Sequence, residues 1–231
     1  MTSAPRNRAV QAKAKEVLQE LRSLITAEST ERSIVEAARR LLTARGLPDT
    51  WYYNCHALVL VGSRSCESVS GQYYVPSEEL VGLSNLVTID LSPCDGEVWG
   101  DCARSFCVED GGVVERPITP EFQEGLRVER ALHAQMTQIV STETTFHALY
   151  EFANDLITKE GFENLDFLGN IGHSIATKRE DRIYVEKGNQ RRINEVTCFT
   201  FEPHIRKRGG RWGFKHENIY FIGESGRAVE V

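Results

Sequence analysis

The stretch Leu86-Val-Thr-Ile-Asp90-Leu-Ser-Pro-Cys-Asp-Gly96-Glu-Val-Trp-Gly-Asp101-Cys-Ala-Arg-Ser-Phe106 is the most informative part of this chain. Two strand-like segments, 86–91 and 98–108, flank a turn at 93–96 and predict an antiparallel hairpin. Such a hairpin can place Asp90 and Asp101 side by side on one face. Two adjacent carboxylates repel each other unless a cation lies between them. Asp90 follows apolar residues in its strand, which argues against a solvated hairpin face.

Three further residues in the second half of the chain complete a candidate site. His173, Glu202 and Glu217 each lie in or beside a strand-like segment. Taken singly, Glu217 reads as an ordinary strand-end glutamate and His173 as part of a turn. As a set with the two aspartates, they supply four carboxylates and one imidazole, which suit two divalent ions. The set predicts a dinuclear metal hydrolase that uses manganese, iron, cobalt or zinc and a metal-bound water.

Size and composition describe an ordinary globular chain. The 231 residues are 41% hydrophobic and carry a formal net charge of -6. An acidic chain is a poor candidate for nucleic-acid binding. No apolar run approaches the roughly 20 residues that span a bilayer, and the N-terminus lacks the apolar core of a secretory signal. The six cysteines include no CxxC pair, which argues against a zinc ribbon or a thioredoxin-like motif. The chain is long enough to fold without disulfides, so we expect reduced thiols in a cytoplasmic protein.

Hydrophobic periodicity divides the chain into two similar halves. Helical spacing predicts a helix over 8–25, a second capped by Ser29 or Thr30 and stopped at Gly46, a third over 120–140, and a fourth from about 144 to 161. Short strands follow each pair. The halves, 8–108 and 119–231, share this element order without an obvious sequence repeat. We predict an α+β fold of two pseudo-symmetric helix-helix-strand halves packed about a shared sheet, with the site between them.

The order Asp, Asp, His, Glu, Glu resembles that of the pita-bread metallopeptidases. This superfamily includes methionine aminopeptidases, Xaa-Pro aminopeptidases, prolidases and creatinase. The aspartate hairpin is the most specific match, and its Arg-Ser-Phe ending at 104–106 leans toward the Xaa-Pro branch. Phe-Thr-Phe-Glu-Pro at 199–203 resembles the family's Thr-Ile-Glu-Pro element, and the glutamate strand at 217–226 resembles its last element. The resemblance covers about 28–231, so residues 1–27 are expected to be a separate helical leader.

The resemblance implies a pita-bread catalytic domain with a curved antiparallel sheet. It implies that Asp101 and Glu217 bridge both ions, that His173 and Glu202 complete one site, and that Asp90 completes the other. Glu202 would also be the general acid/base, and His173 a catalytic ligand. The resemblance further implies a cytoplasmic protein that is a monomer or a homodimer.

Two departures from the family pattern affect the substrate side of the site. The peptidases have a histidine about eighteen residues before the first aspartate, and here that position is close to Gln72. A second family histidine, which follows the metal histidine, is replaced by Lys178-Arg-Glu180. We expect Gln72 to take the place of that histidine at the substrate as a catalytic residue, where its amide can donate a hydrogen bond but cannot act as an acid. His56, His204 or His216 could substitute for it in space, but the expected role of each is packing or surface exposure.

Three functions therefore stay open. The first is hydrolysis of an amide or related acyl bond in a peptide or amino-acid derivative. The second is another reaction on the same metal scaffold, with a specialised small-molecule metabolite as substrate. The third is binding without catalysis, which the retention of all five ligands argues against. The expected partner is a small-molecule or peptide substrate, with no membrane or nucleic acid.

Overall fold

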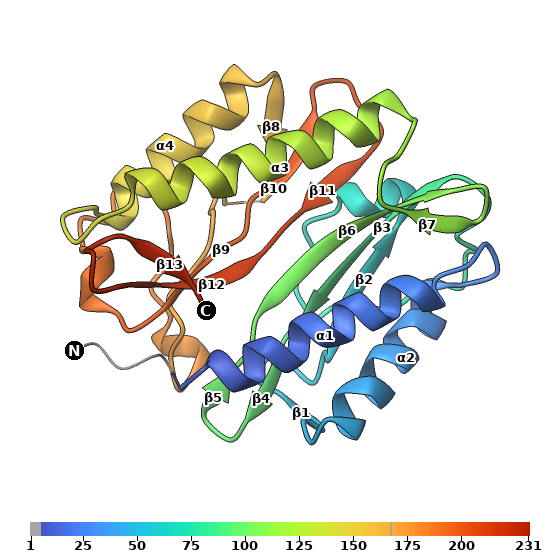
Figure 1. The fold of residues 1–231 in the computed structure, drawn as a ribbon, viewed down its shortest axis with the longest axis horizontal. Helices are drawn as coiled ribbons and strands as arrows, with labels where there is room; N and C mark the ends of the chain where they lie inside the picture. Colours follow the sequence, from blue (N-terminus) through green and yellow to red (C-terminus); the bar gives the residue numbers. More distant parts are fainter. Residues whose placement is uncertain (1–5, 167) are drawn as a thin grey trace.

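A computed structural model describes residues 6–166 and 168–231. The first half contains α1 (Arg8–Leu24), α2 (Glu31–Ala44), β1 (Asp49–Thr50), β2 (Ala57–Val61), β3 (Asn85–Leu91), β4 (Pro93–Asp95), β5 (Val98–Trp99), β6 (Cys102–Glu109) and β7 (Gly112–Val114). The second contains α3 (Pro120–Ile139), α4 (Phe146–Lys159), β8 (Phe162–Asn164), β9 (Phe199–Phe201), β10 (His204–Lys207), β11 (Gly213–Lys215), β12 (Asn218–Ile222) and β13 (Ala228–Glu230). The predicted order of two helices followed by strands is present twice, and Figure 1 shows the helix pairs on opposite sides of the strands.

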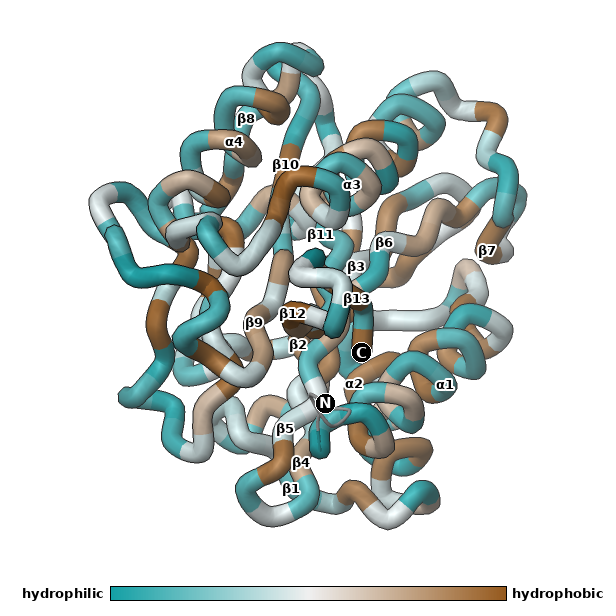
Figure 2. Tube along the Cα trace, turned by 60° about the vertical axis from the view of Figure 1, so that its left-hand side comes forward, coloured by the Kyte–Doolittle hydropathy of each residue, from teal (hydrophilic) through white to brown (hydrophobic). Residues whose placement is uncertain are grey.

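The helices begin where the sequence offers caps. The Thr30 hydroxyl accepts a 3.1 Å hydrogen bond from the Ser33 amide at the start of α2, and Thr145 accepts one of 3.0 Å from Ala148 at the start of α4. Each bond satisfies an amide that has no partner within the helix. Pro120 occupies the first turn of α3, where a missing N–H costs nothing. In Figure 2, hydrophobic and hydrophilic residues alternate along α1 and α3, as expected for helices that cover a sheet.

The first helix belongs to the core of the first half. Its apolar face, from Val10 to Leu21, is buried in the same hydrophobic cluster as β2 and β3. Part of the expected leader over 1–27 therefore packs in the same core as the strands, while the boundary with a catalytic domain over 28–231 stays a prediction from the sequence. Like α2, α1 is amphipathic, and both helices must bury their apolar stripes against the sheet.

The predicted aspartate hairpin is present, with a smaller hairpin inserted between its two strands. Strands β2, β3, β6 and β7 form one antiparallel sheet in that order. In its register Asp90 lies opposite Ala103 rather than Asp101. Between β3 and β6 the chain makes a smaller hairpin, β4–β5, which pairs with β1. Asp101 lies between that small hairpin and β6, so it approaches Asp90 from a bend in the chain.

The two halves join along β6. Ala103 and Glu217 exchange backbone hydrogen bonds of 3.0 and 3.3 Å. Next to them, the Lys215 amide donates to the Ser105 hydroxyl at 2.8 Å. The second half adds two three-stranded sheets, β13-β12-β9 and β11-β10-β8. This junction brings the second half's acidic residues to the aspartates of the first. None of the helices in the described parts of the chain is long and apolar enough to cross a membrane.

Candidate metal centre

The structure brings the five residues predicted as ligands to one place. Asp90, Asp101, His173 and Glu202 line a single cavity of about 330 Å³, and Glu217 is buried beside them with 1% of its surface exposed. Asp90 lies in β3, while Glu202 directly follows β9. Residues from both halves therefore converge, as expected of a site at the junction.

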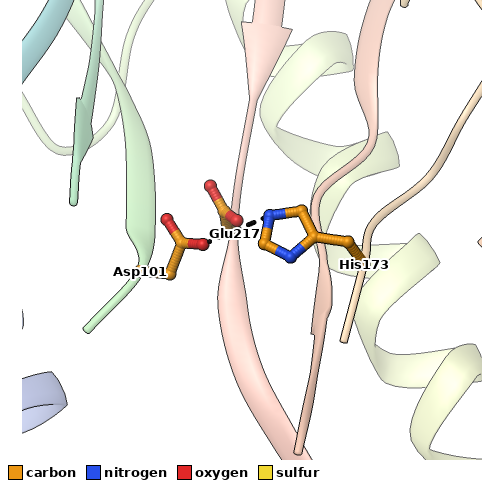
Figure 3. Close-up of side chains that lie close together, drawn as sticks. All are labelled: Asp101, His173 and Glu217. Atoms are coloured by element: carbon orange, nitrogen blue, oxygen red, sulfur yellow. Dashed lines mark ion pairs between the residues drawn. The ribbon is translucent and has the colours of Figure 1, made fainter. Parts of the chain in front are cut away.

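Three of these side chains form a tight group. One ligand atom each from Asp101, His173 and Glu217 lies within 4.8 Å of the others. Figure 3 shows the three side chains pointing toward one another from three separate segments. The His173 Nε2 atom lies 3.5 Å from the nearer Asp101 oxygen. This spacing suits three ligands of one divalent ion, each about 2.0–2.2 Å from the metal.

The buried oxygens of this group lack hydrogen-bond partners. Asp101 Oδ2 and both Glu217 carboxylate oxygens are among the few buried side-chain atoms with no donor in the described chain. An unpartnered buried carboxylate is costly unless it is neutralised or bound to a cation. The same atoms that a divalent ion needs are therefore the ones that the protein leaves free. The donor set fits a metal ion.

His173 is held in the form that binds metals. Its Nδ1 lies 3.0 Å from the Ser174 carbonyl oxygen, so Nδ1 carries the proton and the Nε2 lone pair faces the carboxylates. Burial lowers the pKa of His173 to about 4, which keeps the ring neutral at pH 7. Gly172 makes this placement possible, because a Cβ atom there would lie 2.2 Å from the Thr200 carbonyl oxygen.

Lys215 is the site residue that the sequence analysis missed. Its ammonium nitrogen lies 2.6 Å from Asp90 Oδ2, 3.1 Å from Glu202 Oε2 and 3.6 Å from Glu217 Oε2. A signal for it existed in the sequence. Lys215 precedes Glu217 by two residues, and alternate residues of an extended segment point to the same face.

Charge coupling within this cluster is strong. Burial, followed by neighbouring carboxylates, raises the pKa of Asp101 and of Glu217 well above the ordinary values. Burial acts to raise the pKa of Glu202, but the nearby Lys215 ammonium outweighs burial and lowers that pKa. In turn the carboxylates of Asp90, Glu217 and Glu202 outweigh burial and raise the pKa of Lys215. Asp101 and Glu217 thus resist carrying charge together until a cation joins them.

A glutamine on α1 fixes the backbone of Asp101. The Gln11 side-chain oxygen accepts from the Asp101 amide at 2.8 Å, and its nitrogen donates to the Asp101 carbonyl at 2.8 Å. Gln11 is fully buried. Its amide therefore positions a candidate metal ligand without touching the group of Asp101, His173 and Glu217 side chains.

Replacing Gln11 with leucine is expected to weaken metal binding about 10- to 100-fold, as loss of an outer support of a ligand commonly does. It leaves the Asp101 amide and carbonyl unpaired, so unfolding free energy should fall by about 1–3 kcal/mol. Calorimetric metal titration and urea unfolding measure the two effects. Gln19→Leu, on the exposed side of the same helix, is the control. Unchanged metal affinity in Gln11→Leu would show that the clamp does not position Asp101.

The substrate-side expectations have mixed outcomes. The Gln72 side chain is exposed in a turn and is not among the residues that line the cavity, so its expected contact with substrate finds no support in this geometry. His204 lines the cavity, with Nε2 2.6 Å from the Ser65 carbonyl. His56 instead donates to the Pro48 carbonyl, and His216 packs against His133 of α3.

The cavity wall is aromatic and carries one arginine. Trp51 stacks on Trp99, with ring centroids 4.5 Å apart, and meets the His173 ring edge at 5.6 Å. The Arg182 guanidinium lies 5.2 Å from the Trp51 ring and from the Tyr184 ring. Arg182 and Lys215 are the two cationic side chains among the described residues that line the cavity. This wall was not predicted, because loops far apart in sequence build it.

Comparison with known sequences and structures places the chain in a family. The sequence profile of metallopeptidase family M24 matches residues 6–224. The chain belongs to metallopeptidase family M24. Comparison with curated proteins gave no significant match. The family depends on divalent metal ions, which agrees with the donor set of the site.

Solved structures share the fold of this M24 chain. An X-Pro aminopeptidase from Thermotoga maritima is 18% identical with a TM-score of 0.80, over 97% of this chain and 59% of that one. Prolidase from Pyrococcus furiosus is 18% identical with a TM-score of 0.75, over 98% and 64%. Methionine aminopeptidase from Thermotoga maritima is 15% identical with a TM-score of 0.77, over 100% and 98%.

These likenesses confirm the pita-bread fold. The M24 chain spans about three-fifths of the length of the X-Pro aminopeptidase and the prolidase. At 15–18% sequence identity the resemblance shows only the fold, so activity and substrate have to be argued from the residues of the site.

Proposed function

We propose that this chain is a metal-dependent hydrolase of a small substrate with an amide or related acyl bond, such as a peptide or amino-acid derivative. The observation that carries the proposal is the group of Asp101, His173 and Glu217, in which Asp101 Oδ2 and both Glu217 oxygens are buried without donors from the described residues. A divalent ion bound there would activate water and polarise the substrate's carbonyl group.

The protein's own residues account for the remaining tasks. Glu202 lies at the cavity with 20% of its side chain exposed, and its Oε1 atom is 3.6 Å from His173 Nε2. The Thr200 hydroxyl donates to the same carboxylate oxygen at 3.2 Å, and Lys215 lowers the pKa of Glu202 and keeps it charged. A charged, partly accessible carboxylate beside the ligands suits a general base that later returns its proton to the leaving group.

The cavity suggests the kind of substrate. Its volume of about 330 Å³ suits a small molecule rather than a folded protein. Arg182, on the aromatic wall, suits a substrate carboxylate. A cytoplasmic location and a possible second subunit stay predictions from the sequence.

Assay of metal-reconstituted protein tests the proposal. The protein is stripped with a chelator, reloaded with manganese, iron, cobalt or zinc, and tested on Xaa-Pro dipeptides, methionyl peptides and amino-acid amides. We expect hydrolysis that chelator abolishes and metal restores. Bound metal without cleavage of any member would favour the second candidate, a reaction on a specialised metabolite. The missing family histidines near Gln72 and Lys178 favour that candidate. If the protein binds no metal, only the third candidate function, binding without catalysis, would remain.

Arg182→Gln is expected to raise KM about 10- to 100-fold for substrates with a free carboxylate, the effect of losing one charged hydrogen bond. The matching amides should change little. Steady-state kinetics on each acid and its amide measures the difference. Arg179→Gln is the control, since that nearby guanidinium lies 3.5 Å over the Tyr53 ring. An equal rise in KM for acids and amides would contradict the assignment.

A further inference from the structure

The five predicted ligands are divided between two kinds of cation partner. Asp101, His173 and Glu217 face one another, and their carboxylates have unpartnered oxygens. Asp90 and Glu202 instead face the Lys215 ammonium, at 2.6 and 3.1 Å. Two ions sharing this cluster would need Asp90 for the second ion, and Asp90 is the carboxylate that Lys215 contacts most closely.

Lys215 is fixed in this position by its backbone. Its amide donates to Ser105 Oγ at 2.8 Å, and the Ser105 hydroxyl is 3.1 Å from the Lys215 carbonyl. It pairs with His204 in the β10–β11 ladder. The side chain leaves the sheet on the face of Glu217 and has 20% of its surface exposed. The ladder and the serine fix the backbone of Lys215, and the carboxylates of Asp90 and Glu202 hold its ammonium.

An ammonium group can neutralise a carboxylate but cannot coordinate a metal, because it has three donors and no lone pair. While it binds Asp90, it also repels a second cation at the same oxygens. Its third contact, 3.6 Å to Glu217 Oε2, lies beyond hydrogen-bond length. Glu217 thus remains available to an ion held with Asp101 and His173.

We propose that the centre binds one divalent ion, on Asp101, His173 and Glu217, and that the Lys215 ammonium takes the place of a second ion between Asp90 and Glu202. The inference rests on the proposed function for the use of the ion, and it replaces the two-ion expectation drawn from the sequence. A single ion with a built-in ammonium gives the site a fixed positive charge that no chelator removes.

Counting bound ions tests this directly. Chelator-stripped protein is titrated with Mn²⁺ in a calorimeter, and elemental analysis after gel filtration gives the ions per chain. We expect one ion in the wild type, with the electron paramagnetic resonance pattern of an isolated ion rather than of a coupled pair. Lys215→Ala frees Asp90 and Glu202 and should bind a second ion. Lys215→Arg keeps the charge and should bind one, as should the exposed-lysine control Lys187→Ala.

The outcomes separate this inference from the proposed function. Two ions in the wild type, or only one in a folded Lys215→Ala protein at saturating metal, would overturn the inference even if the protein is an active hydrolase. If Lys215→Ala does not fold, the number of ions bound per chain by the wild type and by Lys215→Arg still tests the inference. One ion in the wild type without hydrolysis of any substrate would leave the inference standing and overturn the function.

Discussion

Glu217→Gln is expected to abolish metal-dependent hydrolysis and to weaken metal binding by at least about 100-fold, more than loss of an outer support does. Glu217 is a member of the tight group of candidate ligands, and both of its oxygens are buried without donors among the described residues. Glutamine has almost the same shape but supplies one neutral oxygen and an amide that repels cations. Calorimetric titration and activity of reconstituted protein measure the two losses.

The same substitution should make the metal-free protein more stable at neutral and higher pH. Burial and nearby carboxylates raise the pKa of Glu217 well above its ordinary value of 4.5. Its contribution to stability is therefore complete below about that pH and is lost as pH rises toward the raised pKa. Each unit of the rise corresponds to about 1.4 kcal/mol. Unfolding of both metal-free proteins should give equal stability in acid and a growing advantage of Glu217→Gln as pH rises.

The exposed Glu224→Gln serves as the control, because it removes a carboxylate from the same region without touching the cluster. It should keep metal binding, activity and the wild-type pH profile. A Glu217→Gln protein that binds metal with wild-type affinity would exclude Glu217 as a ligand. A metal-free variant that is less stable than the wild type at high pH would contradict the charge argument.

Glu202→Gln is expected to lower kcat by about 10²- to 10⁴-fold, the usual contribution of a general acid/base, while the metal stays bound. Glu202 is tied to Thr200 and Lys215 and is not a member of the tight group of three ligands. Removing its charge should therefore stop proton transfer without dismantling the metal site. Kinetics and metal titration on one preparation separate these effects.

Glu67→Gln is a matched control, since Glu67 lines the same cavity but pairs with Arg64. It should change kcat by no more than a few fold. Loss of the metal together with activity in Glu202→Gln would make Glu202 a ligand, as the resemblance implies, and would argue against a purely proton-transferring role.

The helices and the two-half order were predictable because they depend on local signals. Apolar spacing and the caps at Thr30 and Thr145 set α2 and α4 within the chain itself. The aspartate hairpin was predictable for the same reason, although the inserted β4–β5 hairpin shifted Asp90 opposite Ala103. Local sequence does not encode such an insertion, because the pairing of β4 with β1 is a contact between distant segments.

The sequence by itself determined which acidic residues and which histidine can form the centre, because their residue types and order are written in the chain. Only the tertiary structure decided how they are arranged. It placed the ammonium of Lys215 between Asp90 and Glu202, clamped Asp101 with Gln11, and left Gln72 in solvent. These outcomes depend on which distant strands and helices meet at the junction of the halves, and the energy of a buried charge is set by those neighbours rather than by its position in the sequence.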